Sequence, residues 1–161
     1  MVSNTSRLSN LAIIGHLGLV REQLGTLLNP PAVRAELLRN PHAEARLAVE
    51  AAMEEGWILV RRLAGAVPPI FAARLDLGEA EALALALETR SPLVLLDESA
   101  ARLQAQQLGL TFTGVLGMLR RAKRTGRISC LKEQINRLRA EARFFVSPAL
   151  ERALLFSVGE C

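Results

Sequence analysis

The sequence contains no tyrosine, only two cysteines and 4% aromatic residues. So few rings exclude an aromatic platform on which nucleic-acid bases would stack. Cys130 and Cys161 lie 31 positions apart without CxxC or Cys/His neighbours, which argues against a disulfide framework and against a zinc-binding pattern. We therefore expect a reduced, cytoplasmic protein in which Cys130 is a small buried hydrophobe and Cys161 a frayed terminal thiol.

Long hydrophobic runs are also absent. The longest charge-free stretch, residues 103–119, is interrupted by three glutamines and three glycines and is not predicted to cross a membrane. No basic-then-apolar leader opens the chain, so nothing predicts export. The 161 residues are 50% hydrophobic, which predicts a single domain over residues 1–161 with a full core.

The formal net charge of +4 is concentrated in one segment. Residues 1–114 carry ten arginines and twelve acids, whereas residues 115–143 carry nine basic residues and two acids. The basic residues of this segment are Arg120, Arg121, Lys123, Arg124, Arg127, Lys132, Arg137, Arg139 and Arg143. Such a helical segment can attract a phosphate backbone, and a solvated helical face is the alternative of equal weight.

Apolar segments alternate with segments of helical periodicity along the whole chain. The predicted strands are residues 1–4, 26–29, 57–60, 93–96 and 111–113. The predicted helices are residues 6–14, 17–24, 31–39, 41–55, 79–88, 99–108, 115–125, 131–142 and 148–157, with Pro68-Pro69 in a connector. This alternation predicts an α/β fold, a three-layer α/β/α sandwich around a central parallel sheet of about five strands.

Side chains that carry oxygen atoms follow several predicted strands. They are Asn4, Thr5, Ser6, Glu36, Glu79 and Asp97. Because the carboxyl ends of parallel strands meet at one edge of the sheet, these side chains are predicted to gather there. Oxygen donors of this kind bind hard cations such as Mg²⁺ and Mn²⁺. Each side chain also has an ordinary structural explanation. Asn4 and Asp97 could cap helices, Glu79 could interact with a helix dipole, and Glu36 could be a solvated surface carboxylate.

Helical geometry distinguishes Glu79 from the other acids of its helix. Glu81 and Glu88 are seven positions apart and are predicted to share a solvent-facing stripe, whereas Glu79 points to nearly the opposite side. Glu36 falls at the edge of the apolar face of its own helix. Carboxylates turned inward need a cation or a basic partner to offset desolvation. By residue type, the nearest basic candidates are Arg34 and Arg102.

Five segments carry a family resemblance when they are read in order. They are Val2-Ser3-Asn4-Thr5-Ser6-x-Leu8, Pro31-x-Val33-x-x-Glu36, Leu77-Gly78-Glu79-Ala80-Glu81-Ala82, Leu95-Leu96-Asp97-x-x-Ala100-x-Arg102 and Thr113-Gly114-x-Leu116-Gly117-x-Leu119-x-x-Ala122-Lys123-x-x-Gly126. Together they span nearly the whole chain and resemble the PIN domain family of ribonucleases. The last segment is similar to a branch of solitary PIN-like proteins described as predicted nucleic-acid-binding proteins of unknown function.

The resemblance implies a metal-dependent ribonuclease that hydrolyses RNA phosphodiesters with Mg²⁺ or Mn²⁺. It implies that Asn4, Glu36, Glu79 and Asp97 are metal ligands, that the three carboxylates are catalytic, and that Thr5 and Ser6 orient the site. It also implies that the strand at residues 93–96 lies next to the first strand. Most active members have Asp where this chain has Asn4, so weaker metal affinity is expected.

Three functions are compatible with the sequence. The first is a metal-dependent ribonuclease, with the toxin of a toxin–antitoxin pair as one form of it. The second is a catalytically weak nucleic-acid-binding module, and the third is a structural or regulatory protein that uses the fold alone. Candidate partners are RNA, an antitoxin protein and a second copy of the chain in a homodimer. No membrane association is predicted. The predicted nucleic-acid-binding residues are Arg120, Arg121, Lys123, Arg124 and Arg127.

Overall fold

A five-stranded parallel sheet forms the centre of the computed structural model, which describes residues 1–160 apart from the side chains of residues 5–7. The strands are β1 (Val2–Ser3), β2 (Leu27–Asn29), β3 (Ile58–Val60), β4 (Val94–Leu95) and β5 (Phe112–Thr113). Their order is β3-β2-β1-β4-β5, and every neighbouring pair is parallel. The predicted place of β4 beside β1 is therefore confirmed.

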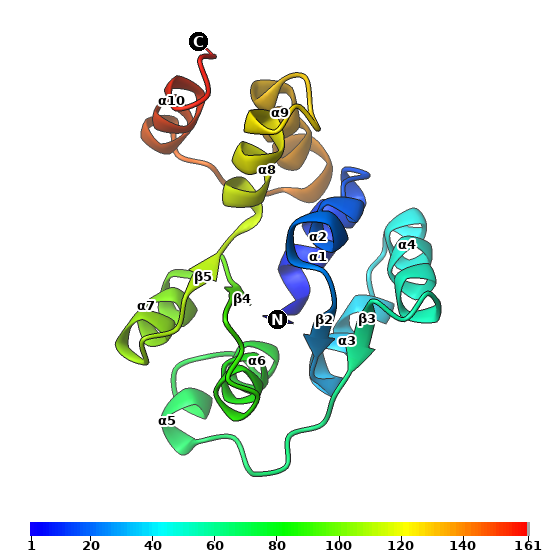
Figure 1. Ribbon diagram of the computed structural model, residues 1–161, viewed down its shortest axis with the longest axis vertical. Helices are drawn as coiled ribbons and strands as arrows, with labels where there is room; N and C mark the ends of the chain where they lie inside the picture. Colours follow the sequence, from blue (N-terminus) through cyan, green and yellow to red (C-terminus); the bar gives the residue numbers. More distant parts are fainter. Residues whose placement is uncertain (161) are drawn as a thin grey trace.

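Helices connect the strands and cover both faces of the sheet (Figure 1). They are α1 (Thr5–Ile13), α2 (Gly18–Leu24), α3 (Pro31–Leu38), α4 (Ala43–Glu54), α5 (Pro69–Ala72), α6 (Leu77–Glu88), α7 (Ser99–Gln107), α8 (Val115–Arg124), α9 (Leu131–Ala142) and α10 (Pro148–Phe156). In Figure 1, α5, α6 and α7 lie below and to the left of the strands, and α8, α9 and α10 form the upper end. No described helix is long and apolar enough to span a bilayer.

Two hydrophobic cores, one on each face of the sheet, confirm the α/β/α sandwich. Successive residues of β4 alternate between them, because side chains of a strand point to opposite faces. Leu95 belongs to the core built with α1, α4, α8 and α9, whereas Val94 and Leu96 belong to the core built with α5, α6 and α7.

The sequence prediction was wrong in two local places. The predicted connector at Pro68-Pro69 contains the short helix α5, whose first residue, Pro69, suits a helical first turn. Helix α6 begins at Leu77 instead of Glu79, because Asp76 is its N-cap and accepts a hydrogen bond from the Glu79 backbone N–H at 2.7 Å. Glu79 is thus the third residue of the helix and forms a capping box with Asp76.

The first turn of α9 is capped by a carboxylate from a distant residue. Glu160 accepts hydrogen bonds from the backbone N–H groups of Leu131 at 2.8 Å and Lys132 at 2.9 Å, and it also contacts Lys123 at 2.9 Å and the Cys130 thiol at 3.6 Å. Cys130 is half-buried at the N-cap position, where its sulfur accepts from the Glu133 N–H. Its predicted role as a buried hydrophobe is therefore corrected, and Cys161 lies outside the described residues.

Replacing Glu160 with Gln is expected to destabilise the protein by about 2 kcal/mol at pH 7. Burial raises the pKa of Glu160, but hydrogen bonds from Lys123, Leu131 and Lys132 outweigh it and lower the pKa from 4.5 to about 2. The lowered pKa means that the stabilisation is fully present above pH 4.5 and is lost as the pH falls towards 2.

Urea unfolding of wild type and E160Q at several pH values between 7 and 3 measures this effect. The difference in the free energy of unfolding should shrink as the pH falls, and the exposed Glu54→Gln on α4 should show no such trend. A difference that is constant with pH would mean that the Glu160 carboxylate does not stabilise α9 by its charge.

Candidate active site

The carboxyl ends of four neighbouring strands place polar side chains along one edge of the sheet. Asn4 follows β1, Asn29 ends β2, Asp97 comes shortly after β4 and Thr113 ends β5. The register pairs Ser3 with Leu95, so the chain leaves β1 and β4 at the same height. This edge is where ligands bind in open parallel sheets.

Asp97 is held by the start of α8 and by an arginine of α7. Its Oδ1 accepts hydrogen bonds from the Val115 backbone N–H at 3.1 Å and from Arg102 Nη2 at 3.0 Å. The Asp97 side chain is only 8% exposed, whereas the Arg102 side chain is 39% exposed, so the carboxylate is the buried partner of the pair. Asp97 therefore caps α8, a helix distant in sequence. Arg102, which sequence reasoning suggested as a basic partner for Glu79 or Glu36, instead pairs with Asp97.

Arg102 is itself fixed by three contacts. Its Nε donates to the Leu96 carbonyl at 3.0 Å, and its guanidinium lies 5.7 Å from the centre of the Phe112 ring. Gly114 makes room for the pair, because a Cβ at this position would lie 2.0 Å from Asp97 Oδ1 and 2.3 Å from Arg102 Nη2. The Asp97–Arg102 pair is thus a packed feature of the sheet edge.

Glu79 is buried, with 4% of its surface exposed, and lies in the first turn of α6. Its side chain accepts from the Asp76 backbone N–H at 3.4 Å as part of the capping box. The prediction that it faces inward is confirmed, and part of its hydrogen-bonding capacity is used within its own helix. Asp76 was missed by sequence reasoning, although the spacing Asp-x-x-Glu before an apolar run is the signal that identifies such a cap.

Glu36 is exposed on α3, contrary to the expectation of an inward-turned carboxylate. It nevertheless lies against α6, because a Cβ at Gly78 would be 3.3 and 3.4 Å from its two oxygens. The same point would be 3.5 Å from Asp76 Oδ1, so these two carboxylates flank Gly78. The exposed stripe predicted for α6 is also corrected, because Glu81 is half-buried and accepts from the Ala32 N–H at 3.2 Å, at the start of α3.

Two asparagines at the sheet edge are buried without matching hydrogen bonds. Asn4 is 3% exposed and its Oδ1 has no partner among the described residues. Asn29 is fully buried, and its Oδ1 and Nδ2 are both unpartnered in the same described set. Burying an amide without a hydrogen-bond partner costs about 1–3 kcal/mol of folding free energy by mutational measures. A bound water molecule or a ligand that contacts the amide would remove this cost. Sequence reasoning missed Asn29, whose only signal is a polar residue ending an apolar strand.

The predicted metal ligands have suitable oxygen atoms, and each of the three carboxylates has different surroundings. Asp97 is bound to Arg102 and α8, Glu79 takes part in the capping box of α6, and Glu36 is exposed. Among the described residues, no three or more His, Cys, Asp or Glu side chains form a group that could hold a metal ion. The predicted orienting side chains of Thr5 and Ser6 lie outside the description.

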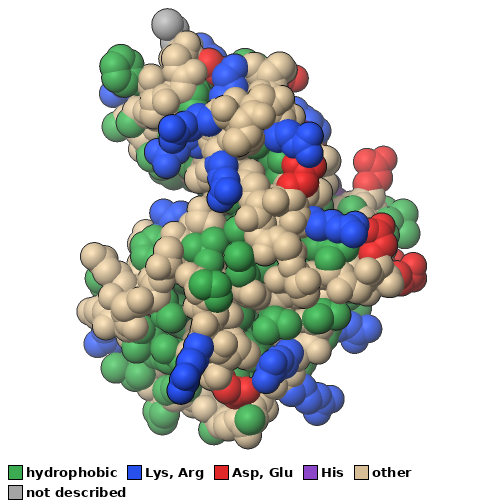
Figure 2. Space-filling model, viewed as in Figure 1, with side chains coloured by type: hydrophobic (Ala, Val, Ile, Leu, Met, Phe, Trp, Pro, Cys, Tyr) green, Lys and Arg blue, Asp and Glu red, His purple; other side chains and the backbone are tan. Residues whose placement is uncertain are grey.

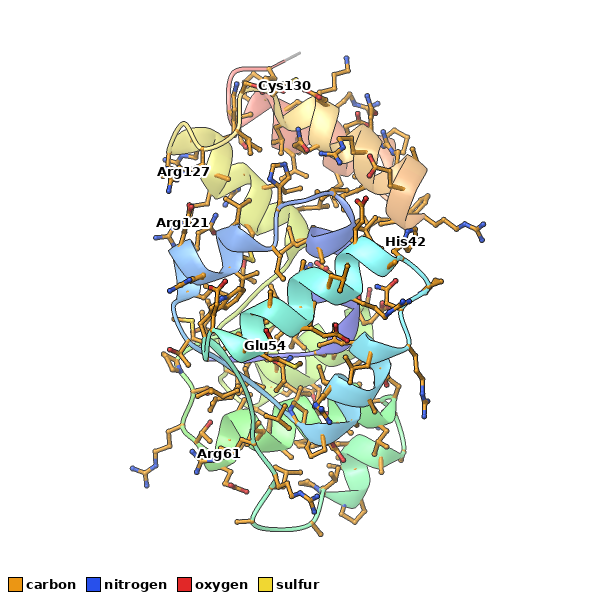
Figure 3. All side chains as sticks on the ribbon, turned by 90° about the vertical axis from the view of Figure 1, so that its right-hand side faces the viewer. His42, Glu54, Arg61, Arg121, Arg127 and Cys130 are labelled. Carbon is orange, nitrogen blue, oxygen red and sulfur yellow. The ribbon has the colours of Figure 1, made fainter. Side chains whose placement is uncertain are left out.

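The basic segment divides into paired and unpaired residues. Lys123 contacts Glu160, and Arg127 contacts Glu22 at 2.8 Å. Figure 2 shows Lys and Arg side chains over the upper part of the molecule, where α8, α9 and α10 lie, and Figure 3 labels Arg121 and Arg127 at its edge. Within the described part of the chain, the predicted nucleic-acid-binding residues without an ion pair are Arg120, Arg121 and Arg124.

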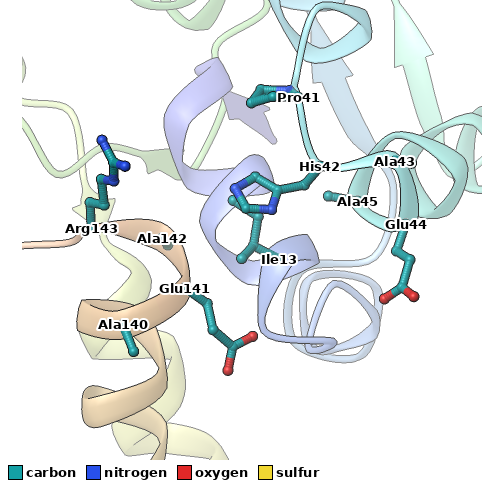
Figure 4. A pocket seen from close by; sticks show the side chains of 10 residues that line it. All are labelled: Ile13, Pro41, His42, Ala43, Glu44, Ala45, Ala140, Glu141, Ala142 and Arg143. Atoms are coloured by element: carbon teal, nitrogen blue, oxygen red, sulfur yellow. The ribbon is translucent and has the colours of Figure 1, made fainter.

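A separate hollow of about 810 Å³ lies between the start of α4 and the end of α9. Figure 4 shows His42 and Glu141 facing it, together with Ile13 of α1. The hydrogen bond from Arg137 lowers the pKa of Glu141, so this carboxylate already has a cationic partner. Asn4 and Ile13 lie at opposite ends of α1, about 13 Å apart at 1.5 Å per residue, so this hollow is distinct from the sheet edge.

Comparison with known proteins supports the resemblance seen in the motifs. Searches against curated proteins and against solved structures found no match. A family model described as a PIN domain matches residues 1–160, nearly the whole chain. The parallel sheet with helices on both faces is consistent with that family. The chain therefore belongs to the PIN domain family.

Proposed function

We propose that the chain is a ribonuclease that hydrolyses RNA phosphodiesters at the carboxyl edge of its sheet, with low intrinsic activity. The single observation that carries the proposal is the unpartnered, buried Oδ1 of Asn4 at the end of β1, the strand beside the one that leads to Asp97. The PIN fold supports a nuclease, and this edge is the place where open parallel sheets bind ligands. Glu36, Glu79 and Asp97 are the proposed catalytic carboxylates.

Mg²⁺ or Mn²⁺ is the proposed cofactor, because PIN domains generally use a divalent metal ion. Arg102 already neutralises Asp97, and Asn4 supplies an oxygen without a charge. A cation would have to compete with Arg102 for the Asp97 carboxylate. Both features lower the expected metal affinity, and they explain why low activity is proposed.

Changing Asn4 to Asp is expected to strengthen metal binding by restoring a negative charge at the end of β1. The new carboxylate is buried, so the variant should be less stable than wild type in the presence of EDTA. Saturating Mn²⁺ should reverse this loss, because a ligand at 100 times its dissociation constant stabilises the native state by about 2.7 kcal/mol.

Thermal unfolding in EDTA and in increasing Mg²⁺ or Mn²⁺, together with cleavage of a structured RNA, measures this expectation. Asn136→Asp on the exposed side of α9 makes the same change of charge and should behave as wild type. Wild-type protein without a metal-dependent shift, together with an Asn4→Asp variant that neither binds metal nor cleaves RNA, would reject the ribonuclease proposal.

A catalytically weak RNA-binding module is the second candidate function. The Asp97–Arg102 pair favours it, because a structural ion pair occupies the carboxylate that a metal ion would need. Salt-dependent RNA binding without cleavage in any divalent metal would support this function. Among the described residues, no feature favours a toxin with an antitoxin partner or a homodimer.

A further inference from the structure

Three arginines of α8 surround one hollow on the surface of the protein. The hollow has a volume of about 530 Å³. Its lining residues are Thr113, Gly117, Arg120, Arg121, Arg124 and Thr125. We call it the three-arginine hollow. All three arginines are exposed, so their guanidinium groups are accessible to a ligand from solution.

The charge of the three-arginine hollow is not balanced within the described chain. Four other basic residues of the same segment have carboxylate partners, in the pairs Lys123–Glu160, Arg127–Glu22, Arg137–Glu141 and Arg139–Glu151. No described acid pairs with Arg120, Arg121 or Arg124, and the lining contains no Asp or Glu. Three cations in one hollow repel one another, and a bound anion would remove that repulsion.

The floor of the hollow depends on Gly117. A Cβ at this position would lie 2.8 Å from Thr113 Oγ1, so glycine leaves the threonine hydroxyl uncovered. That hydroxyl has no hydrogen-bond partner among the described residues, whereas the Thr125 hydroxyl donates to the Arg121 carbonyl at 3.0 Å. The hollow therefore offers three guanidinium groups and one available hydroxyl donor, which are the groups that bind phosphate oxygens.

Thr113 connects the three-arginine hollow to the surroundings of Asp97 along the backbone. Thr113 is followed by Gly114, which packs against Asp97, and by Val115, whose N–H binds Asp97. Thr113 of β5 is also paired in register with Leu95 of β4, two residues before Asp97. A ligand that contacts Thr113 thus lies next to the edge where the scissile phosphodiester is proposed to bind.

We propose that the three-arginine hollow binds backbone phosphates of the RNA strand whose scissile bond lies at the sheet edge. The inference rests on the proposed function for the identity of the ligand. Of the nine basic residues at positions 115–143, it assigns phosphate binding to Arg120, Arg121 and Arg124. Guanidinium forks bind phosphates in bidentate fashion without reading bases. The hollow would therefore set the position of the strand and leave sequence selection to other groups.

The triple substitution of Arg120, Arg121 and Arg124 by Gln tests this inference. Binding of a labelled single-stranded RNA oligomer is measured in EDTA, so that the result does not depend on metal or on cleavage. We expect at least about tenfold weaker binding at low salt, and a slope of log K against log salt that is smaller by about 2, at about 0.7 for each lost phosphate contact. Circular dichroism and thermal unfolding establish that the variant folds.

A matched variant separates the hollow from net charge. Arg39, Arg74 and Arg152 are exposed, lie on or at the ends of three other helices and, in the described part of the chain, have no ion pair. Their replacement by Gln changes the net charge equally, and it should leave the affinity and the salt slope near wild type. Equal losses in the two triple variants would overturn the proposal, as would wild-type protein that does not bind RNA in EDTA.

The same measurement distinguishes RNA from other anions. Inorganic phosphate should weaken the binding of the oligomer no more than another salt of the same ionic strength does. A polyglutamate peptide of equal charge should bind far more weakly than RNA. If the peptide bound as tightly and with the same dependence on Arg120, Arg121 and Arg124, the hollow would be a site for acidic proteins and the RNA inference would be rejected. Loss of cleavage in Asp97→Asn with intact RNA binding would leave the inference standing.

Discussion

Replacing Asp97 with Asn is expected to abolish RNA cleavage and to lower the free energy of unfolding by about 2–4 kcal/mol. The amide removes the charge that pairs with Arg102 at 3.0 Å, and it leaves a cation that is 39% exposed without that partner. It also weakens the cap that Asp97 provides for the Val115 N–H at the start of α8. Because one carboxylate supports both the fold and the proposed chemistry, both effects follow from one substitution.

The two effects are separable by experiment. Urea unfolding gives the loss of stability, and cleavage is then assayed at a temperature where the variant remains folded. Glu54→Gln on α4 removes an exposed carboxylate and should alter neither property. Full cleavage activity in a folded Asp97→Asn protein would show that Asp97 is a structural residue only and that the chemistry lies elsewhere.

The change of Gly114 to Ala is expected to be almost as damaging, at about 2–4 kcal/mol, although it adds one methyl group. Gly114 has φ −133° and ψ 179°, an extended conformation that alanine adopts freely, so backbone strain is not the cause. The added Cβ would lie 2.0 Å from Asp97 Oδ1 and 3.0 Å from the Leu96 carbonyl oxygen. Asp97 must move, and its contacts with Arg102 and Val115 are then lost.

Gly18→Ala is the matched control, because a Cβ at Gly18 meets no atom within 4 Å and φ there is not positive. Chemical denaturation should show a large loss for Gly114→Ala and a loss near zero for Gly18→Ala. Equal stability of the two variants would mean that the sheet edge around Asp97 is loosely packed, in conflict with the geometry described for Gly114.

Much of the fold was predictable because its signals are local. Pro31 marks the first residue of α3, and Gly25 and Gly56 follow the ends of α2 and α4 with φ near +75°, where glycine is favoured. The apolar run at residues 93–96 indicated the interior strand β4. These elements depend on neighbours a few positions away, and the order of the motifs then placed β4 beside β1.

The candidate site was less predictable because its contacts join residues far apart in sequence. The spacing of Asp97 and Arg102 could indicate a pair, but the cap on Val115 depends on how β4 and β5 lie side by side. Likewise, helical periodicity predicts that Glu81 is a surface acid, and yet it accepts a hydrogen bond from the Ala32 N–H at the start of α3, 49 positions away. Residue type and helical period describe neighbours within a few positions, so they do not predict contacts between residues this far apart in the sequence.

The cap on α9 has a consequence for the order in which the chain becomes structured during synthesis. The acceptor that satisfies the Leu131 N–H belongs to a residue 29 positions later. A ribosome that has just completed α9 has therefore not yet made the carboxylate that stabilises the start of that helix. Until then, the start of α9 depends on the burial of Leu131 in the core that it shares with α1 and α8. The contacts of Glu160 with Leu131, Lys132 and Lys123 should therefore be among the last to form in a newly made chain.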